Sequence, residues 1–587
     1  MQNFFIIEHK EEIGHYRQTF ITANSEVPIL IGFENTIILK IIYPFSKKII
    51  FLRNCLIDSG YHMGCKNKFL VGIIILVQIF ALCNFGYSQK KYFVSFSNKK
   101  NVSFNPYNYF DQKTIDKRLS NNIALYDSSD FPVNNSYLKQ LLEITDNIKT
   151  ISRWLNGVSV FANENQLLLI ESLPFVKSIE SLNSLAVIST NEFDTSLNKQ
   201  DLNLIKGQIE RMEGNLFISN GINGQGVRIA IFDVGFKTVN ESPFFEHIFS
   251  KNKIIKTYDF IKNSEFVYDY GMHGATVMSC IGGKINNTNI GLATNAEFLL
   301  ARTEYLVREP FSEEENWLAA AEWADKNGAD IINSSLGYVH HRYFPSDMDG
   351  KTSLVSRAAN MAARKGILVV NSMGNSGTDD WKYLATPADA DSVLSIGGIS
   401  PETNYHTSFS SYGPTADGRL KPNVTSFAHV IAAGKGNLHE TQGTSFSSPL
   451  VAGFAACALQ MNPNYSNIEL FHEIEKSGDL YPYYDYAHGY GVPQASYFIN
   501  DDKKVVEQTF KFETEGDIIK VIVKESEIYG KFNLLFYHIE NENKQLDKYT
   551  VIRVYQSDVI QFSKSDYINN EILRVHFKGY TSEINFN

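Results

Sequence analysis

The chain has 587 residues, too many for one ordinary domain, and its length indicates about two to four. Hydrophobic residues make up 43% of the chain and charged residues 20%, which is a globular rather than a disordered composition. The formal net charge of -10 and the lack of a basic stripe exclude a nucleic-acid-binding role, which requires a basic surface.

Residues 63–88 have the pattern of a signal peptide. Two lysines precede an apolar run at residues 69–83, and the small residues Gly86 and Ser88 form a cleavage site. An uncleaved membrane anchor is the alternative, because the run approaches the length that spans a bilayer. We therefore predict export, to the medium or to the cell surface.

Residues 1–62 contain apolar pieces that charges interrupt, and they show no domain pattern. Because a signal peptide is normally N-terminal, our hypothesis is that translation begins at Met63. The alternative is a cytoplasmic extension ahead of a signal anchor.

Residues 89–182 are predicted to form a small α+β domain. Strands are expected at KYFVSF, twice within NIKTISRWLNGVSVFA, and at FVKSIES, and helices at SYLKQLLEI and ENQLLLIESLP. The resulting order β-α-β-β-α-β is that of a split βαβ, or ferredoxin-like, fold. Residues 183–207 lack a sustained period and are expected to be a linker.

Strands and helices alternate from residue 208 to residue 498. VRIAIF, EFLLA, ADIINSS and ILVVNS are short apolar runs typical of strands buried on both faces, with helical patterns between them. Gly328 and Gly366 end two of these helices, and SNIE at 466–469 is a capping box for another. The pattern predicts an α/β fold with a doubly wound parallel sheet, in which functional groups lie beyond the carboxyl ends of the strands.

Residues 502–587 are predicted to form a small β-sandwich. VVEQTFKFE, IIKVIVKE and KFNLLFYHIE alternate with period two and are separated by turn residues.

Three segments of the α/β region carry candidate catalytic residues. VRIAIFDVGF ends a buried strand with Asp233, GMHGATVMSCIGG places His273 at a helix start, and GTSFSSPLVAGFAA places Ser445 at another. Serine needs an imidazole to remove its proton, and the imidazole needs a carboxylate to fix its tautomer. Singly, each residue is an ordinary turn, cap or structural residue. Together, in the order Asp, His, Ser on a parallel sheet, they predict a catalytic triad.

These motifs resemble those of the subtilisin family of serine peptidases, the subtilases. FDVGF, HGATV and GTSFSSP match the family's aspartate, histidine and serine motifs in its chain order. The resemblance implies an endopeptidase that hydrolyses peptide bonds through an acyl-enzyme on Ser445. Val234 and Phe446 depart from the small residue and the methionine common beside the family's Asp and Ser, but neither position supplies a catalytic group.

Two further segments resemble parts of the family's active site. NSSLG is similar to the strand that lines the substrate cleft, which implies substrate binding by Ser335, Leu336 and Gly337. NSMGNSG is similar to the turn that forms the oxyanion hole, which gives that role to Asn375, with the Ser445 backbone N–H as second donor.

Residues 89–182 resemble the propeptide of these enzymes, whose C-terminal tail, here SIESLNSLAV, blocks the cleft. The order of signal peptide, propeptide, peptidase and β-domain is similar to that of secreted peptidases of Bacteroidetes-like bacteria. It implies a monomeric precursor, inhibited by its own propeptide and cut between residues 183 and 206. No cofactor is implied for the chemistry and no metal site is assigned, although relatives leave structural calcium open.

Several alternatives remain open at this point. A degenerate peptidase fold kept as a scaffold predicts the loss of a catalytic group, and an esterase predicts a Gly-x-Ser-x-Gly elbow; the sequence shows neither.

Cys280 and Cys457 are expected to be free and buried, with a disulfide as the alternative. A metal site at His340 and His341 is disfavoured, because adjacent residues of a strand point to opposite faces.

Overall fold

The structure is a computed structural model, and its chain divides into two compact units, Met1–Tyr87 and Ser88–Asn587. It describes residues 4–10, 16–22, 89–182, 199–305, 312–339, 342–434, 436–499, 506–524, 533–555, 557–568 and 570–586. In the first unit, β1 (Phe4–Lys10) and β2 (Tyr16–Thr22) pair antiparallel, a hairpin that the sequence did not predict. The predicted signal peptide lies outside the described residues, and no helix within them is long and apolar enough to cross a membrane.

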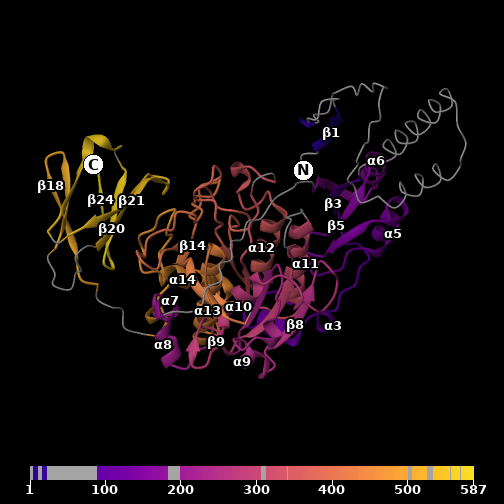
Figure 1. Ribbon diagram of the computed structural model, residues 1–587, viewed down its shortest axis with the longest axis horizontal. Helices are drawn as coiled ribbons and strands as arrows, with labels where there is room; N and C mark the ends of the chain where they lie inside the picture. Colours follow the sequence, from indigo (N-terminus) through magenta and orange to yellow (C-terminus); the bar gives the residue numbers. More distant parts are fainter. Residues whose placement is uncertain are drawn as a thin grey trace, which may run out of the picture. The chain divides into compact units, whose positions relative to one another are not determined.

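A parallel sheet of seven strands forms the centre of the second unit (Figure 1). The strand order is β15-β14-β13-β12-β7-β11-β8, and every pairing is parallel. The strands in chain order are β7 (Arg228–Asp233), β8 (Ile254–Asp259), β11 (Glu297–Arg302), β12 (Ile331–Ser334), β13 (Leu368–Ser372), β14 (Val393–Ile399) and β15 (Val424–Phe427).

Helices cover both faces of this sheet, because its strands are apolar on both sides. In β7, Ile229 and Ile231 belong to the core shared with α10 (His273–Gly282) and α13 (Thr444–Met461). Ala230 and Phe232 point to the opposite core, shared with α11 (Ser312–Lys326) and α12 (Leu354–Arg364). The predicted doubly wound α/β architecture is confirmed.

Shorter elements complete this region. They are α8 (Gly214–Ser219), α9 (Glu246–Phe249), α14 (Asn467–Lys476), α15 (Ser496–Ile499), and the hairpins β9 (Lys284–Ile285) with β10 (Thr288–Asn289) and β16 (His429–Ala433) with β17 (Leu438–Gln442). The capping box predicted at Ser466 and Glu469 is present at the start of α14.

Helix α7 (Lys199–Glu210) begins inside the segment that the sequence analysis treated as a linker. Ile205 and Ile209, one helical turn apart, are buried in the core with α10 and α13. The Gln208 amide donates to Ile290 O at 2.8 Å and accepts from Ile431 N at 3.1 Å. The assignment of residues 199–207 to a linker was therefore wrong, because a short apolar stripe on a polar helix is enough for docking.

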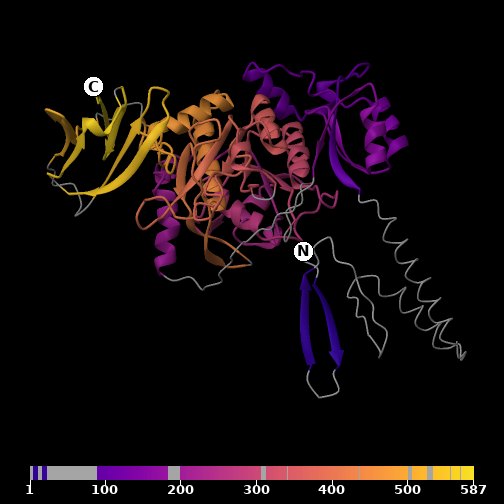
Figure 2. The same cartoon turned by 90° about the horizontal axis from the view of Figure 1, so that it is seen from above.

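Residues 90–181 contain the predicted β-α-β-β-α-β order. It consists of β3 (Lys90–Phe96), α5 (Asn135–Ile144), β4 (Ile148–Ser152), β5 (Gly157–Ala162), α6 (Glu164–Glu171) and β6 (Val176–Ser181), in the antiparallel sheet β4-β5-β3-β6. One face of the sheet packs on α5 and α6. The other face adds Phe93 and Trp154 to the core formed with α11 and α12, so this sheet lies beside those helices (Figure 2).

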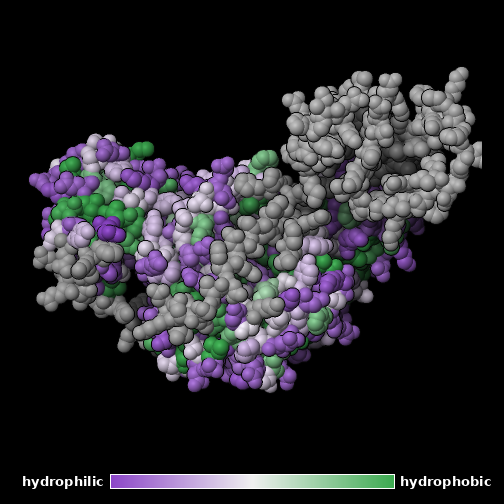
Figure 3. Space-filling view, viewed as in Figure 1, coloured by the Kyte–Doolittle hydropathy of each residue, from purple (hydrophilic) through white to green (hydrophobic). Residues whose placement is uncertain are grey.

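The C-terminal region is the predicted β-sandwich. Sheet β18-β19-β22 and sheet β21-β20-β23-β24 share one apolar core. The strands are β18 (Phe510–Glu515), β19 (Ile518–Val523), β20 (Asn533–Glu540), β21 (Leu546–Val554), β22 (Val559–Ser563), β23 (Ile572–Phe577) and β24 (Tyr580–Asn585). On the face drawn in Figure 3, a patch of hydrophobic residues lies over this sandwich.

The sandwich docks on the α/β region through a buried aromatic contact. Tyr483, fully buried, stacks on His538 with ring centroids 5.0 Å apart, and Phe536 packs against it. His538 Nδ1 bonds to Tyr484 O at 2.6 Å.

Helices α10 and α13 approach each other with little side-chain volume between them. A Cβ atom at Gly453 of α13 would lie only 2.7 Å from the Ile281 carbonyl oxygen of α10. Cys280 and Cys457, one on each helix, are free and buried as predicted, and burial raises the pKa of the Cys280 thiol to about 12.

This close approach generates a stability prediction. Gly453→Ala should lower the free energy of unfolding by about 1–3 kcal/mol, because the new methyl group meets backbone that cannot move freely. The matched control is Gly207→Ala in helix α7, where the nearest atom to a new Cβ is 3.6 Å away. That change should be neutral or stabilise by about 0.5–1 kcal/mol through helix propensity. Urea or thermal unfolding measures both, and equal effects would contradict the steric account.

Candidate active site

Asp233 is the last residue of the central strand β7, and it is fully buried. Its Oδ1 accepts a hydrogen bond from Val234 N at 2.8 Å. The chain turns sharply at Gly235, where φ is 150° and a Cβ atom would lie 1.9 Å from Tyr270 O. Only glycine fits there, so the turn holds the carboxylate at the carboxyl end of the sheet.

His273 is the first residue of helix α10, and it faces Asp233. Its Nδ1 lies 2.9 Å and 3.0 Å from the two carboxylate oxygens of Asp233. Gly274 permits this approach, because a Cβ atom there would lie 2.4 Å from Gly235 O. Since an ionised carboxylate only accepts hydrogen bonds, Nδ1 carries the proton, and Nε2 of the neutral ring is the basic nitrogen.

Ser445 lies in the first turn of helix α13, directly after Gly443 and Thr444. Its hydroxyl donates to Ser335 O at 3.3 Å, and the Ser335 hydroxyl donates back to Ser445 O at 2.8 Å. The ring of His273 lies 5.6 Å, centroid to centroid, from that of Phe446, the next residue of the helix. The structure therefore brings Asp233, His273 and the start of α13 to one edge of the sheet.

The side-chain amide of Asn375 is held by the residue before Ser445. Its Oδ1 accepts from Thr444 N at 2.9 Å and from Thr444 Oγ1 at 3.0 Å. Because only the amide oxygen can accept from a backbone N–H, these contacts fix the amide orientation. A Cβ atom at Gly443 would lie 3.6 Å from Asn375 Nδ2 and 3.8 Å from Ser445 N, so the two nitrogens border one small space.

Ser335, Leu336 and Gly337 follow strand β12 directly. Leu336 is 5% exposed, and its carbonyl accepts from Asn371 Nδ2 at 3.0 Å. A Cβ atom at Gly337 would lie 2.7 Å from Ala385 Cβ, so a larger residue would push this segment away from its neighbour.

Sequence reasoning missed the polar group that joins this segment to α13. Asn333, fully buried at the end of β12, donates to Ser335 Oγ at 3.2 Å and accepts from Ser448 Oγ at 2.9 Å. The signal was an amide inside an apolar strand, because buried polar groups require partners. Thr444 was also missed, although it is part of the serine motif.

No group of three or more His, Cys, Asp or Glu side chains gathers as a cation site within the described ranges. His340 and His341 lie outside the described residues. Structural calcium therefore stays a prediction without a location.

Comparison with protein families decides the class of this domain. The model of the subtilase family (peptidase S8) matches residues 224–491, which hold Asp233, His273, Asn375 and Ser445. The chain contains a peptidase domain of the subtilase family. A second model, the peptidase S8 propeptide domain of Bacteroidota, matches residues 91–199. The subtilase resemblance is therefore confirmed, and the region around the β3–β6 sheet is a propeptide domain of the same family.

Curated relatives are similar to the subtilase domain. The alkaline protease of Alkalihalobacillus alcalophilus is 29% identical over 271 residues, covering 46% of this chain and 63% of that protein. Subtilisin Savinase of Lederbergia lenta is 28% identical over 271 residues, covering 46% of this chain and 89% of that protein. The chain thus spans less than two thirds of the length of the first of these relatives.

One solved structure extends the similarity beyond the subtilase domain. The epidermin leader peptide processing serine protease of Staphylococcus aureus covers 71% of this chain and 100% of its own, with a TM-score of 0.50. At 15% sequence identity, it supports the fold alone.

The Asn333 network generates a prediction about how α13 is held. Asn333→Ala should lower the free energy of unfolding by about 1–3 kcal/mol, because buried hydroxyls on Ser335 and Ser448 lose their partner. Asn220→Ala, at an exposed helix end, is the matched control and should change it by less than about 0.5 kcal/mol. Chemical denaturation of the two variants checks this, and a neutral Asn333 variant would contradict the proposed link.

Proposed function

We propose that the protein is a secreted serine endopeptidase with Asp233, His273 and Ser445 as its catalytic triad. The observation that carries this proposal is the contact of His273 Nδ1 with both oxygens of the buried Asp233, at 2.9 Å and 3.0 Å, beside the start of α13. The subtilase match over residues 224–491 supports it.

The proposed mechanism begins with proton transfer from Ser445 Oγ to His273 Nε2. The hydroxyl rotates away from its long contact with Ser335 O, and Asp233 stabilises the imidazolium that forms. Ser445 Oγ then attacks the peptide carbonyl carbon, and the protonated imidazole gives its proton to the leaving amine. Water hydrolyses the resulting acyl-enzyme by the same steps in reverse order.

Negative charge on the carbonyl oxygen is stabilised by Asn375 Nδ2 and the Ser445 backbone N–H. These donors are already oriented, because the Asn375 oxygen is occupied by Thr444. The N-terminus of α13 adds a favourable dipole at the same position. Ser335, Leu336 and Gly337 border the substrate chain. The chemistry uses no cofactor, and proteins or peptides are the substrates.

We further propose that the chain is made as an inhibited monomeric precursor and exported. The Bacteroidota-type propeptide domain supports inhibition by the chain's own propeptide, whose tail from residue 183 lies outside the described residues. The signal-peptide pattern at residues 63–88 supports export. The maturation cut is expected between residues 183 and 206.

A fluorophosphonate probe tests the nucleophile. The mature protein should be labelled stoichiometrically at Ser445, because the activated hydroxyl attacks phosphorus as it attacks a carbonyl. Ser445→Ala should abolish labelling, and Ser447→Ala, two positions along the same helix, is the matched control that should retain it. Folded protein that stays unlabelled, or that is labelled equally after Ser445→Ala, would end the proposal.

The oxyanion assignment predicts a graded effect on kcat. Asn375→Ala should lower kcat by about 10²–10³ with little change in KM, which is the loss known for removal of the equivalent donor in another enzyme of this family. Thr444→Val removes only one of the two hydrogen bonds that orient the amide, so kcat should fall by about tenfold or less. Steady-state kinetics on a peptide substrate measure both. An Asn375 variant with full kcat would contradict the role.

A further inference from the structure

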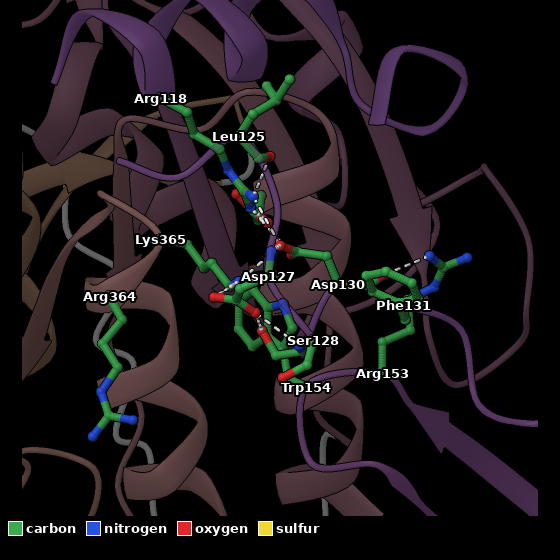
Figure 4. A network of polar contacts seen from close by, with 12 residues as sticks. Arg118, Leu125, Asp127, Ser128, Asp130, Phe131, Arg153, Trp154, Arg364 and Lys365 are labelled. Atoms are coloured by element: carbon green, nitrogen blue, oxygen red, sulfur yellow. Dashed lines mark hydrogen bonds and ion pairs between the residues drawn. The ribbon is translucent and has the colours of Figure 1, made fainter. Parts of the chain in front are cut away.

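Arg302 is a buried cation close to the proposed triad, and the mechanism above does not use it. It is the last residue of β11, and it is 2% exposed. A buried charge is costly unless it is paired, so its position requires an explanation. Arg118 and Lys365, which are also buried, lie where the propeptide domain meets the subtilase domain (Figure 4). The contacts of Arg302 lie instead within the subtilase domain, beside the proposed triad.

The central sheet places Arg302 between two aspartates. In the parallel register, Arg302 lies opposite Asp233 of β7 on one side and opposite Asp259 of β8 on the other. Neighbouring strands are about 4.8 Å apart, and register partners point their side chains to the same face of the sheet. The guanidinium therefore lies on the face that carries the carboxylate of Asp233.

The guanidinium holds the turn that follows Asp233. Its Nε donates to Val234 O at 2.8 Å, and Val234 N donates to Asp233 Oδ1 at 2.8 Å. The residue after Arg302 adds a second hydrogen bond, because Thr303 N donates to Asp233 O at 3.0 Å. Val234 is thus fixed through both its N–H and its carbonyl group, and its N–H orients the carboxylate that faces His273.

The same guanidinium packs against the segment that leads to His273. Its central carbon lies 3.7 Å from the centre of the Tyr270 ring, which is a cation–π contact. The Tyr270 carbonyl also lies against the turn, since a Cβ atom at Gly235 would be 1.9 Å from its oxygen. His273 follows three residues later, at the start of α10. One side chain therefore contacts both the turn after the carboxylate and the segment before the imidazole.

Asp259 compensates the charge of Arg302. It is fully buried and accepts from Arg302 Nη1 at 2.8 Å, and its other oxygen accepts from two backbone N–H groups of the following turn, at 2.9 Å each. The pair adds no net charge beside the triad. The carboxylate of Asp233 therefore stays paired with the imidazole, and both its oxygens lie within 3.0 Å of His273 Nδ1.

We propose that Arg302 is a positioning residue that sets the geometry between Asp233 and His273. The inference rests on the proposed function, because it is the triad mechanism that makes this geometry important. A guanidinium suits the task, since its planar fork donates in two directions while its face stacks on an aromatic ring. Because Arg302 acts through Val234 and Tyr270 rather than on the substrate, its loss should lower kcat and leave KM nearly unchanged.

Steady-state kinetics on a peptide substrate test the inference. Each variant carries a recognition sequence for an added site-specific protease between residues 182 and 199, so that maturation does not depend on its own activity, and the propeptide domain is separated after the cut. Arg302→Met should lower kcat by about 10–10²-fold, which is the loss that a misplaced catalytic group causes. Arg302→Lys keeps the charge but lacks the fork, so it should recover only part of that loss.

Lys421→Met is the matched control. Lys421 is also 2% exposed, but it lies shortly before β15, at the opposite end of the sheet from Asp233. This variant should lose stability, because a buried cation is replaced in the same way, and it should retain kcat. Thermal unfolding of both variants makes the comparison at similar losses of stability.

A second measurement needs no catalysis. In the full chain with Ser445→Ala, the proton on His273 Nδ1 should give a far-downfield proton NMR signal that His273→Gln removes, because the proton is held by a carboxylate. Arg302→Met should move this signal upfield or broaden it, and Lys421→Met should leave it unchanged. A purely structural role for Arg302 would not move the signal.

An Arg302→Met variant that folds, keeps kcat within about twofold of an active parent and keeps the downfield signal would overturn the inference. If that variant does not fold, Tyr270→Leu and Asp259→Asn weaken the same contacts from the other side. Each should lower kcat by about threefold or more and move the signal, and no change in either variant would overturn the inference. If the folded parent is inactive, the proposed function fails, and the NMR signal alone decides whether Arg302 positions the pair.

Discussion

The contact of helix α10 with helix α13 is made almost backbone to backbone, where Gly453 meets the Ile281 carbonyl. Both helices lie on one face of the same parallel sheet, and they begin at the edge where strand β7 ends. His273 is the first residue of one helix and Ser445 the second residue of the other. Because the helices cannot slide without opening this contact, the imidazole, the hydroxyl and the carboxylate of Asp233 share one edge.

Several uncharged polar groups then fix the positions of the side chains and backbone at that edge of the sheet. Asn333 joins the cleft segment to α13, and Thr444 turns the Asn375 amide so that its nitrogen faces the space beside Ser445 N. None of these hydrogen bonds needs an ion or a mobile loop. The arrangement is therefore already formed before a substrate arrives, which is what electrostatic stabilisation of an oxyanion requires.

Much of the fold and of the candidate site could be predicted from the sequence, wherever the local hydrophobic pattern agrees with the tertiary fold. After Arg228, β7 is apolar on both faces up to Phe232, which predicts a strand buried on both sides. Asp233 follows at the carboxyl end of that strand. Helix α7 was missed because its apolar stripe is short and its other positions are polar. Helices α3 (Pro106–Tyr109) and α4 (Gln112–Ser120) were missed for a related reason. Arg118 and Lys113 look like surface residues in the sequence, yet each pairs with a carboxylate of the subtilase domain. Long-range charge pairing leaves no periodic signal along the chain.

Residues 111–130 of the propeptide domain contact the beginnings of strands that are far apart in sequence. Arg228 starts β7, Asp330 stands before β12, and Lys365 stands shortly before β13. More than a hundred residues lie between the starts of β7 and β12. A parallel sheet assembles slowly, because the entropy cost of closing such a loop comes before the pairing that stabilises the strands. A segment that binds all three starts at once holds them at the spacing of neighbouring strands. The contacts of residues 111–130 therefore reach three adjacent strands of the sheet, β13, β12 and β7, at the end opposite Asp233.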